Sequence, residues 1–161
     1  MILAIDPGPQ ESGFVLYDNK NSTVKKFGKV LNRELEDMII DELQNVPTYI
    51  EFPQAQGCLA SNALLLTCRW AGRYEAHSNL VELINRKDVV NFFECHKRTR
   101  QEKSEGIKQV AFDTQIRHKI IEMFGGSKEV AIGVKKSPGP LYGVKADVWQ
   151  ALAIALMVAK D

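Results

Sequence analysis

Three carboxylates stand where the ends of secondary-structure elements are expected. Asp6 follows the apolar run 1–5, Glu51 lies in the apolar stretch 48–52, and Asp147 begins an apolar segment that reaches residue 159. An ionised Glu in a buried strand costs on the order of several kcal/mol unless another group pairs with it. Acids that cluster repel one another, and a divalent cation with a preference for hard oxygen ligands, Mg²⁺ or Mn²⁺, relieves that repulsion.

The chemistry open to such a cluster is hydrolysis of a phosphodiester. Two divalent ions about 4 Å apart can activate a water molecule and stabilise the leaving 3′ oxygen during in-line displacement. We therefore interpret Asp6, Glu51 and Asp147 as candidate catalytic residues and metal ligands.

Each carboxylate also has a purely structural interpretation. Asp6 followed by Pro-Gly is typical of an Asx-type turn, and Glu51 is compatible with a solvent-facing position at a sheet edge. Asp147 and Gln150 match the spacing of a capping box. Taken singly, the cap is the stronger explanation of Asp147. The conjunction of all three acids favours the metal site.

The elements that must position these acids follow from hydrophobic pattern and turn signals. Apolar runs bounded by turn residues predict strands over 1–5, 13–17 and 23–30, joined as an antiparallel meander. A helix capped by Asn32 and ended by Val46-Pro47 comes next, and a strand over 48–52 follows it.

The second half of the chain is predicted to be mainly helical. A helical pattern extends over about 59–84 with a possible break at Gly72, and the following stretches are predicted to be a strand (89–94), a mobile loop (97–108), a helix (112–124) closed by Gly125-Gly126, an irregular segment (135–143) and a buried helix (147–159). The order βββαβαβ followed by helices is typical of an α/β RNase H-like fold with a mixed five-stranded sheet. If the first and fourth strands are neighbours, Asp6 and Glu51 lie side by side.

Size and composition fit one domain over residues 1–161. Apolar residues make up 45% of the chain and charged residues 25%, as in ordinary globular proteins. No apolar run approaches the roughly 20 residues that a membrane span needs, and no signal peptide is recognisable. Cys58, Cys68 and Cys95 lack the spacing of a zinc site and suggest reduced thiols. We therefore expect a cytoplasmic protein.

Charge is distributed unevenly along the chain. Between Cys95 and Lys136 there are ten Lys or Arg against five Asp or Glu, although the whole chain carries only +1. Such segregation suits a protein with one surface that faces a polyanion. The predicted DNA-binding residues are Lys97, Arg98, Arg100, Lys103, Lys108, Arg117, Lys119, Lys135 and Lys136.

Several segments resemble those of RuvC-type Holliday-junction resolvases, members of the RNase H-like superfamily. The opening Ile2-Leu-Ala-Ile-Asp6-Pro-Gly8, the strand segment Tyr49-Ile-Glu51 and the final Asp147-Val-Trp-Gln-Ala-Leu-Ala-Ile-Ala155 carry this likeness. Three further stretches look closer still to short phage-borne RuvC-like proteins: Cys68-Arg-Trp-Ala-Gly-Arg73, Arg86-Lys-Asp88-Val and Pro138-Gly-Pro-Leu-Tyr-Gly143.

This resemblance implies a homodimeric, Mg²⁺-dependent endodeoxyribonuclease that cleaves four-way or other branched DNA and accepts Mn²⁺ in place of Mg²⁺. If the protein is phage-borne, it acts in the cytoplasm of the bacterial host. The chain departs from the family at Gln150, where RuvC proteins carry a second acid on the last helix. An amide oxygen can coordinate a cation but supplies no charge, so Gln150 is predicted to be a weak metal ligand.

Other functions remain open or are excluded at this point. A non-catalytic protein that binds branched DNA is motivated by Gln150, and a nuclease for RNA–DNA hybrids is possible on the same fold. The segment from Ala4 to Gly13 also resembles the phosphate loop of actin-like ATPases, but those enzymes need two such lobes, and no Walker motif occurs. We expect no nucleotide cofactor and no membrane partner.

Weaker candidates accompany this site. Asp113 is a possible fourth carboxylate, and Phe14, Tyr74 and Tyr142 are possible aromatic wedges that unstack bases at a branch. The polar residues Gln54, Gln56, Ser61 and Asn62 follow Glu51 and are candidates for contact with the scissile region. Each also fits a role in the core, a helix or a polar loop.

Overall fold

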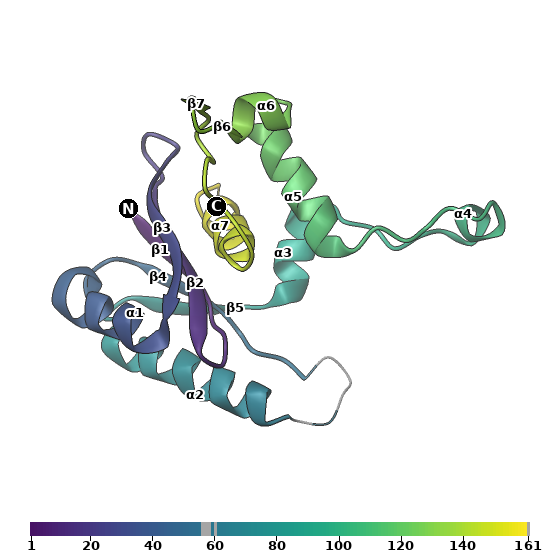
Figure 1. Ribbon diagram of the computed structural model, residues 1–161. Helices are drawn as coiled ribbons and strands as arrows, with labels where there is room; N and C mark the ends of the chain where they lie inside the picture. Colours follow the sequence, from purple (N-terminus) through teal and green to yellow (C-terminus); the bar gives the residue numbers. More distant parts are fainter. Residues whose placement is uncertain (56–58, 60, 161) are drawn as a thin grey trace. The chain divides into compact units, whose positions relative to one another are not determined.

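Five strands form one mixed sheet in the computed structural model, which describes residues 1–55, 59 and 61–160 (Figure 1). Their order is β3-β2-β1-β4-β5. β2 pairs antiparallel with β1 and β3, whereas β4 pairs parallel with β1 and β5. Their bounds are β1 (Ile2–Asp6), β2 (Glu11–Asp18), β3 (Thr23–Leu31), β4 (Thr48–Glu51) and β5 (Val81–Ile84). The predicted meander and parallel strands are confirmed.

The location predicted for the fifth strand is wrong. β5 lies at Val81–Ile84, within the stretch expected to be helical, and residues 89–94, expected to be a strand, fall largely in α3 (Arg86–Phe92). The apolar run Val89 to Phe93 suggested a strand by composition, but both of these residues are buried four positions apart, which is helical spacing. The preceding helix α2 (Asn62–His77) runs through Gly72 without a break.

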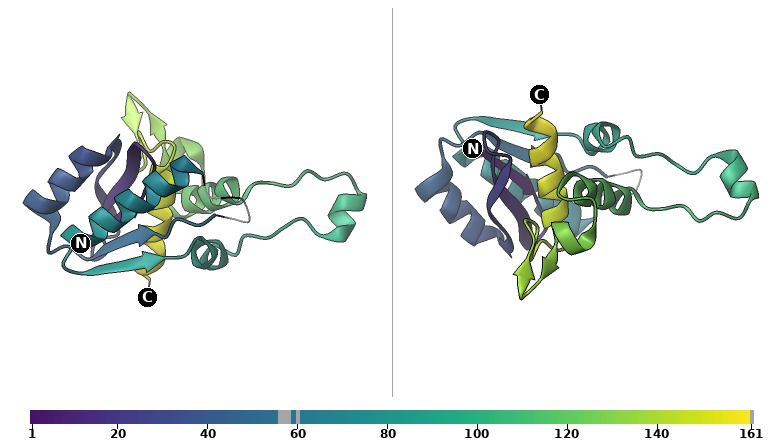
Figure 2. Two further views of the ribbon diagram at one scale, coloured as in Figure 1. Left: turned by 90° about the horizontal axis from the view of Figure 1, so that it is seen from below. Right: turned by 90° about the horizontal axis from the view of Figure 1, so that it is seen from above.

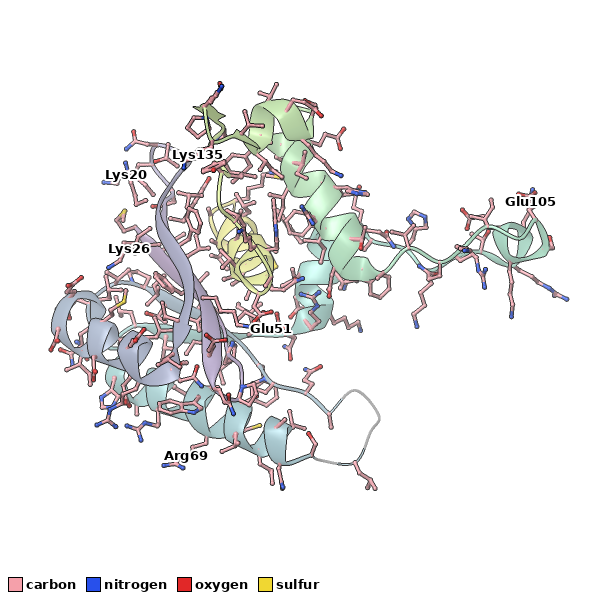
Figure 3. The ribbon with its side chains drawn as sticks, viewed as in Figure 1. Lys20, Lys26, Glu51, Arg69, Glu105 and Lys135 are labelled. Atoms are coloured by element: carbon pink, nitrogen blue, oxygen red, sulfur yellow. The ribbon has the colours of Figure 1, made fainter. Side chains whose placement is uncertain are left out.

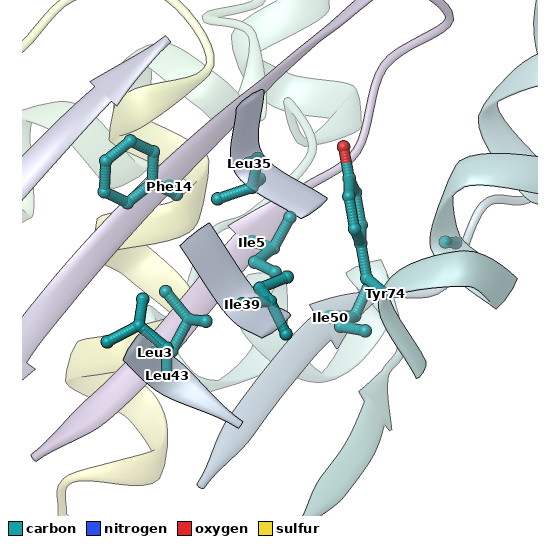
Figure 4. Close-up of a cluster of buried hydrophobic side chains, with 9 residues drawn as sticks. Leu3, Ile5, Phe14, Leu35, Ile39, Leu43, Ile50 and Tyr74 are labelled. Atoms are coloured by element: carbon teal, nitrogen blue, oxygen red, sulfur yellow. The ribbon is translucent and has the colours of Figure 1, made fainter. Parts of the chain in front are cut away.

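Helices cover both faces of this sheet (Figure 2). On one face, α1 (Asn32–Met38), its π-helical continuation η1 (Ile39–Leu43) and α2 bury Leu35, Ile39 and Tyr74 against Ile5 and Ile50 (Figure 4). On the other face lies α7 (Val148–Val158), which packs on β1, β2 and β4. Every residue of α7 from 148 to 157 except Gln150 is buried, which confirms the predicted buried final helix.

A buried polar network fixes the turn that follows Asp6. The backbone N–H of Gly8 donates to Ser12 Oγ at 3.2 Å, and Ser12 Oγ donates to Asn32 Oδ1 at 2.7 Å. Asn32 Nδ2 in turn donates to the carbonyl of Gly8 at 2.9 Å. The prediction that Asn32 caps α1 is therefore wrong: the N-cap is Leu31, and the side chain of Asn32 holds the Gly8 turn instead.

The chain divides into two compact units, Met1–Arg86 with the segment that begins at Gly143, and Lys87–Tyr142. The first contains the sheet, α1, η1, α2 and α7. The second contains most of α3 and the shorter elements α4 (Arg100–Ser104), α5 (Phe112–Met123), α6 (Lys128–Ala131), β6 (Gly133–Val134) and β7 (Ser137–Pro138). The organisation as one nuclease domain stays a prediction.

Two details of the second unit differ from expectation. The stretch 97–108, predicted to be a loop, contains α4, which a capping box between Thr99 and Glu102 begins. The stretch 135–143, predicted to be irregular, includes β7 of a short hairpin with β6. The predicted helix over 112–124 is confirmed as α5, and Gly125 and Gly126 follow it with positive φ angles.

No helix within the described residues is long and apolar enough to cross a bilayer.

A buried carboxylate links α1 to α2. Glu36 is 2% exposed, and its two oxygens accept hydrogen bonds from Nε and Nη2 of Arg73, each at 2.6 Å. These bonds hold the pKa of Glu36 below its ordinary value, against the opposing effect of burial. The Arg73 guanidinium also lies 4.9 Å above the ring of Trp70. The Glu36–Arg73 pair thus joins α1 to α2 on one face of the sheet.

We predict that Glu36→Gln lowers the free energy of unfolding by roughly 3 kcal/mol, the lower end of what breaking a buried ion pair costs. Because folding lowers the Glu36 pKa, its contribution is complete above the ordinary value of 4.5 and is lost as the pH falls through the lowered value. Urea unfolding at neutral and acidic pH measures both effects. Glu34→Gln, an exposed change on the same helix, is the control, and equal stability of the two variants would contradict the prediction.

Candidate functional site

Asp6 and Glu51 end neighbouring strands. β1 and β4 are parallel, and Ile5 lies opposite Ile50, so the next residue of each strand is one of the two acids. Both are half-buried, and Glu51 lies at the carboxyl end of β4 (Figure 3). β4 lies between β1 and β5, so the interpretation of Glu51 as a sheet-edge residue is wrong. Ligands of open α/β sheets bind at this end of the strands.

Gly13 brings the third acid to the same face of the sheet. Gly13 pairs with Asp6 on one side and Lys29 on the other, and residues paired across strands point to the same face. A Cβ atom on Gly13 would lie 2.7 Å from the backbone carbon of Asp147. The missing side chain therefore leaves the space that the start of α7 fills, directly between Asp6 and Lys29.

The carboxylate of Asp147 pairs with Lys29. Its Oδ2 lies 2.8 Å from Lys29 Nζ, and Glu11 Oε2 lies 3.8 Å from the same nitrogen. The hydrogen bond to Asp147 raises the pKa of Lys29, and the charges of Asp147, Glu11 and Asp6 act in the same direction. Although Asp147 is the N-cap residue of α7, its side chain makes no capping hydrogen bond. The capping-box interpretation is therefore wrong.

Arg86 joins Glu51 to Gln150. Its Nη1 donates a hydrogen bond to Gln150 Oε1 and lies 3.5 Å from Glu51 Oε2. The Glu51 and Arg86 side chains are only 18% and 17% exposed, and the Oε2 atom itself is buried in an ion pair that lacks hydrogen-bond geometry. The predicted ligands Glu51 and Gln150 are thus brought together, with a guanidinium between them.

Two of the predicted acidic ligands are paired with cationic side chains: Asp147 with Lys29 and Glu51 with Arg86. Among the residues that the structure describes, no three His, Cys, Asp or Glu side chains are arranged to hold one metal ion. The donor atoms nevertheless suit Mg²⁺ or Mn²⁺ in kind, because carboxylate and amide oxygens are the ligands these ions prefer. The backbone also brings Asp6, Glu51 and Asp147 to one end of the sheet. Their assignment as metal ligands and catalytic residues stays a prediction.

Sequence reasoning missed Lys29 and Arg86. Arg86 lies in one of the stretches that resemble phage-borne proteins, but it was given no role there. Its position near Glu51 becomes evident only once β5 is placed correctly. Ile84 of β5 pairs with Glu51, and Arg86 follows Ile84 by two residues. Lys29 could have been found from the meander alone, because the register Asp6, Gly13, Lys29 follows from the two hairpins.

Some weaker candidates are corrected. Phe14 and Tyr74 are buried in the core, so neither is an exposed wedge, and burial raises the pKa of Tyr74 to about 12. Tyr142 is 42% exposed and stays a candidate. Asp113 lies in the first turn of α5, in the second unit.

The polar segment after Glu51 has partners of its own. Gln54 Nε2 donates to Asn85 Oδ1 at 2.9 Å, and Ser61 caps α2 by accepting a hydrogen bond from the N–H of Leu64. Asn62 begins α2 and is exposed. Gln56 and Cys58 lie outside the described residues.

The predicted DNA-binding residues all fall in the second unit. Seven of the nine are exposed, and Arg98 and Lys119 are half-buried. Arg98 Nη1 donates to the carbonyl of Ile107 at 2.5 Å, and Lys119 Nζ lies 3.6 Å from Glu94 Oε2. The exposed residues are Lys97, Arg100, Lys103, Lys108, Arg117, Lys135 and Lys136. Their contact with DNA stays a prediction.

Solved structures resemble this chain over almost its whole length. A structure of Thermus thermophilus RuvC superimposes with a TM-score of 0.56 at 16% identity, covering 97% of this chain and 91% of that one. The fold is that of RuvC. A second structure, T. thermophilus RuvC in complex with Holliday junction substrate, gives a TM-score of 0.52 at the same identity and covers 97% of this chain and 90% of that one. No family model and no curated protein matches the sequence.

We predict that Gly13→Ala lowers the free energy of unfolding by about 1–3 kcal/mol, because its new methyl group would overlap the backbone of Asp147. The matched control is Gly72→Ala in α2, where a methyl group meets nothing within 4 Å. That change should leave stability equal or raise it by up to about 1 kcal/mol through helix propensity. Urea unfolding compares the two, and a stable Gly13→Ala variant would contradict the close approach of α7 to β2.

Proposed function

We propose that this protein is a divalent-metal-dependent endodeoxyribonuclease that cleaves four-way (Holliday) or other branched DNA. The observation that carries the proposal is that the backbone places Asp6, Glu51 and Asp147 at the carboxyl end of the neighbouring parallel strands β1 and β4 in a RuvC fold. A RuvC of this fold has been solved with a Holliday junction substrate, which supports branched DNA as the ligand class. The proposal includes a cytoplasmic location, where the DNA of a bacterial host would be reached.

The acids would hold Mg²⁺, with Mn²⁺ as a substitute, through carboxylate oxygens of Asp6, Glu51 and Asp147, and Gln150 is the weakest candidate ligand. The bound ion supplies activation of water and charge stabilisation at the scissile phosphate. The protein's own residues set the geometry. The β1–β4 pairing fixes Asp6 beside Glu51, and Gly13 admits the start of α7. Lys29, whose Nζ lies 2.8 Å from Asp147 Oδ2, would have to give up this contact for the ion to bind Asp147.

DNA would be held mainly through its phosphates. The exposed Lys and Arg side chains of the second unit offer positive charge to DNA phosphates, and phosphate contacts carry no base sequence information by themselves. Resolving a four-way junction requires a cut in each of two strands, and a homodimer would present one site to each of them. The dimer is part of the proposal.

A non-catalytic protein that binds branched DNA is the second candidate. It is favoured by one observation: Arg86 and Lys29 already balance the charges of Glu51 and Asp147. Incubation with a synthetic four-way junction separates the candidates. Formation of two nicked duplexes in Mg²⁺ would support the nuclease, whereas binding without cutting in Mg²⁺ and Mn²⁺ would support the second candidate. Faster cutting of an RNA–DNA hybrid than of the junction would contradict both candidates and indicate a hybrid nuclease.

We predict that Asp6→Asn, Glu51→Gln and Asp147→Asn each reduce junction cleavage by at least about 10–100-fold, the loss typical even of residues that only support a metal ligand. Junction binding should survive, because phosphate contacts carry the affinity. Cleavage gels and mobility-shift assays in Mg²⁺ measure the two quantities. Asp37→Asn, an exposed change on α1, is the control. Undiminished cleavage by the Glu51→Gln variant would refute the assigned site.

We predict that changing Lys97, Lys103 and Lys108 together to Gln weakens junction binding and lowers its salt dependence. The slope of log K against log salt should fall by about 0.9 for each DNA phosphate that the variant no longer neutralises. Fluorescence anisotropy over a range of salt concentrations gives this slope. Lys20→Gln with Lys26→Gln, two exposed lysines of the first unit, is the control. An unchanged slope in the triple variant would show that DNA binds elsewhere.

A further inference from the structure

One cationic side chain lies among the predicted metal ligands. The Arg86 side chain is 17% exposed, its Nη1 atom donates to Gln150 Oε1, and the same atom lies 3.5 Å from the buried Oε2 of Glu51. The guanidinium therefore contacts the two side chains that a cation on this side of the site would need as ligands.

The backbone holds Arg86 at this place. Ile84 pairs with Glu51 in the parallel β4–β5 register, and Arg86 follows two residues later as the first residue of α3. A guanidinium is always charged and presents its donors in a fixed plane. Its removal would leave a largely buried carboxylate without this compensating charge, which strongly destabilises a folded protein. A cation that binds both Glu51 and Gln150 would have to displace Arg86 against this cost.

The other side of the site differs. Asp147 is held by Lys29, whose side chain is 38% exposed and whose ammonium sits on a flexible stem. Lys29 can therefore move into solvent at little cost, which makes the carboxylate of Asp147 available to a divalent ion. The amide of Gln150 adds no negative charge that would attract a second ion.

We propose that Arg86 takes the place of a second cation, so that the site binds one divalent ion and Arg86 supplies the remaining positive charge between Glu51 and Gln150. This inference rests on the proposed function, because it concerns the same site. Arg86 acts through Glu51 and Gln150 and is a positioning residue.

Calorimetric titration with Mn²⁺, without DNA, tests the proposal. The wild-type protein should bind one ion, and Gln150→Asp should still bind one, because Arg86 pairs with the new carboxylate. Arg86→Gln combined with Gln150→Asp should bind two. Two ions bound by the wild type or by Gln150→Asp alone would overturn the inference and leave the proposed function standing. Absence of Mn²⁺ binding together with absence of junction cleavage would overturn both.

Melting temperatures distinguish a variant that binds Mn²⁺ weakly from one that is poorly folded. In a chelator, Arg86→Gln should melt below wild type, Arg86→Lys should lie between them, and Mn²⁺ should restore Arg86→Gln more than it shifts wild type. Arg69→Gln, an exposed change on α2 that points away from the sheet (Figure 3), should behave as wild type. A melting temperature of Arg86→Gln that equals wild type in chelator, with no larger response to Mn²⁺, would overturn the role of Arg86.

Discussion

Repulsion between carboxylates is the constraint on which the arrangement of this site depends. Asp6, Glu51 and Asp147 meet at one end of the sheet, and Glu11 adds a fourth acid near Lys29. Half-buried acids at such positions need positive charge close by. The protein provides it from two directions, with Lys29 from the edge strand β3 and Arg86 from the segment after β5.

The face of the sheet that carries these charges is also covered by the buried helix α7. Gly13 makes both possible, because its missing side chain leaves room for the start of that helix. A side chain larger than hydrogen at this position would overlap the start of α7. With glycine, the helix lies close enough for Asp147 to reach Lys29, while its apolar body covers β1, β2 and β4. The pairing of Asp6, Gly13 and Lys29 across β1, β2 and β3 therefore fixes two things on this face of the sheet. It places the charged groups at one end, and it lets α7 pack on the apolar remainder.

Much of this could be predicted from local pattern, and what failed was mostly non-local. The meander, α7 and the neighbouring positions of Asp6 and Glu51 followed from apolar runs and turn residues. The strand β5 was misplaced because Val81–Ile84 is only four residues long and follows a strongly helical segment, while Val89 to Phe93 is rich in strand-forming residues. Arg86 was missed as a direct result, because its contact with Glu51 depends on where β5 pairs.

Internal charge compensation also separates folding of this site from metal binding. Many small metal centres fold only with their ion, because the ligands repel one another without it. Here the ion pairs with Lys29 and Arg86 let the acids lie together in the protein alone. In the proposed function, binding of a metal ion would therefore be an exchange in which the ion displaces a protein cation. Such an exchange favours the side whose resident cation is more exposed and more flexible, which is the Lys29 side, and it disfavours the side where a half-buried guanidinium is fixed by the fold.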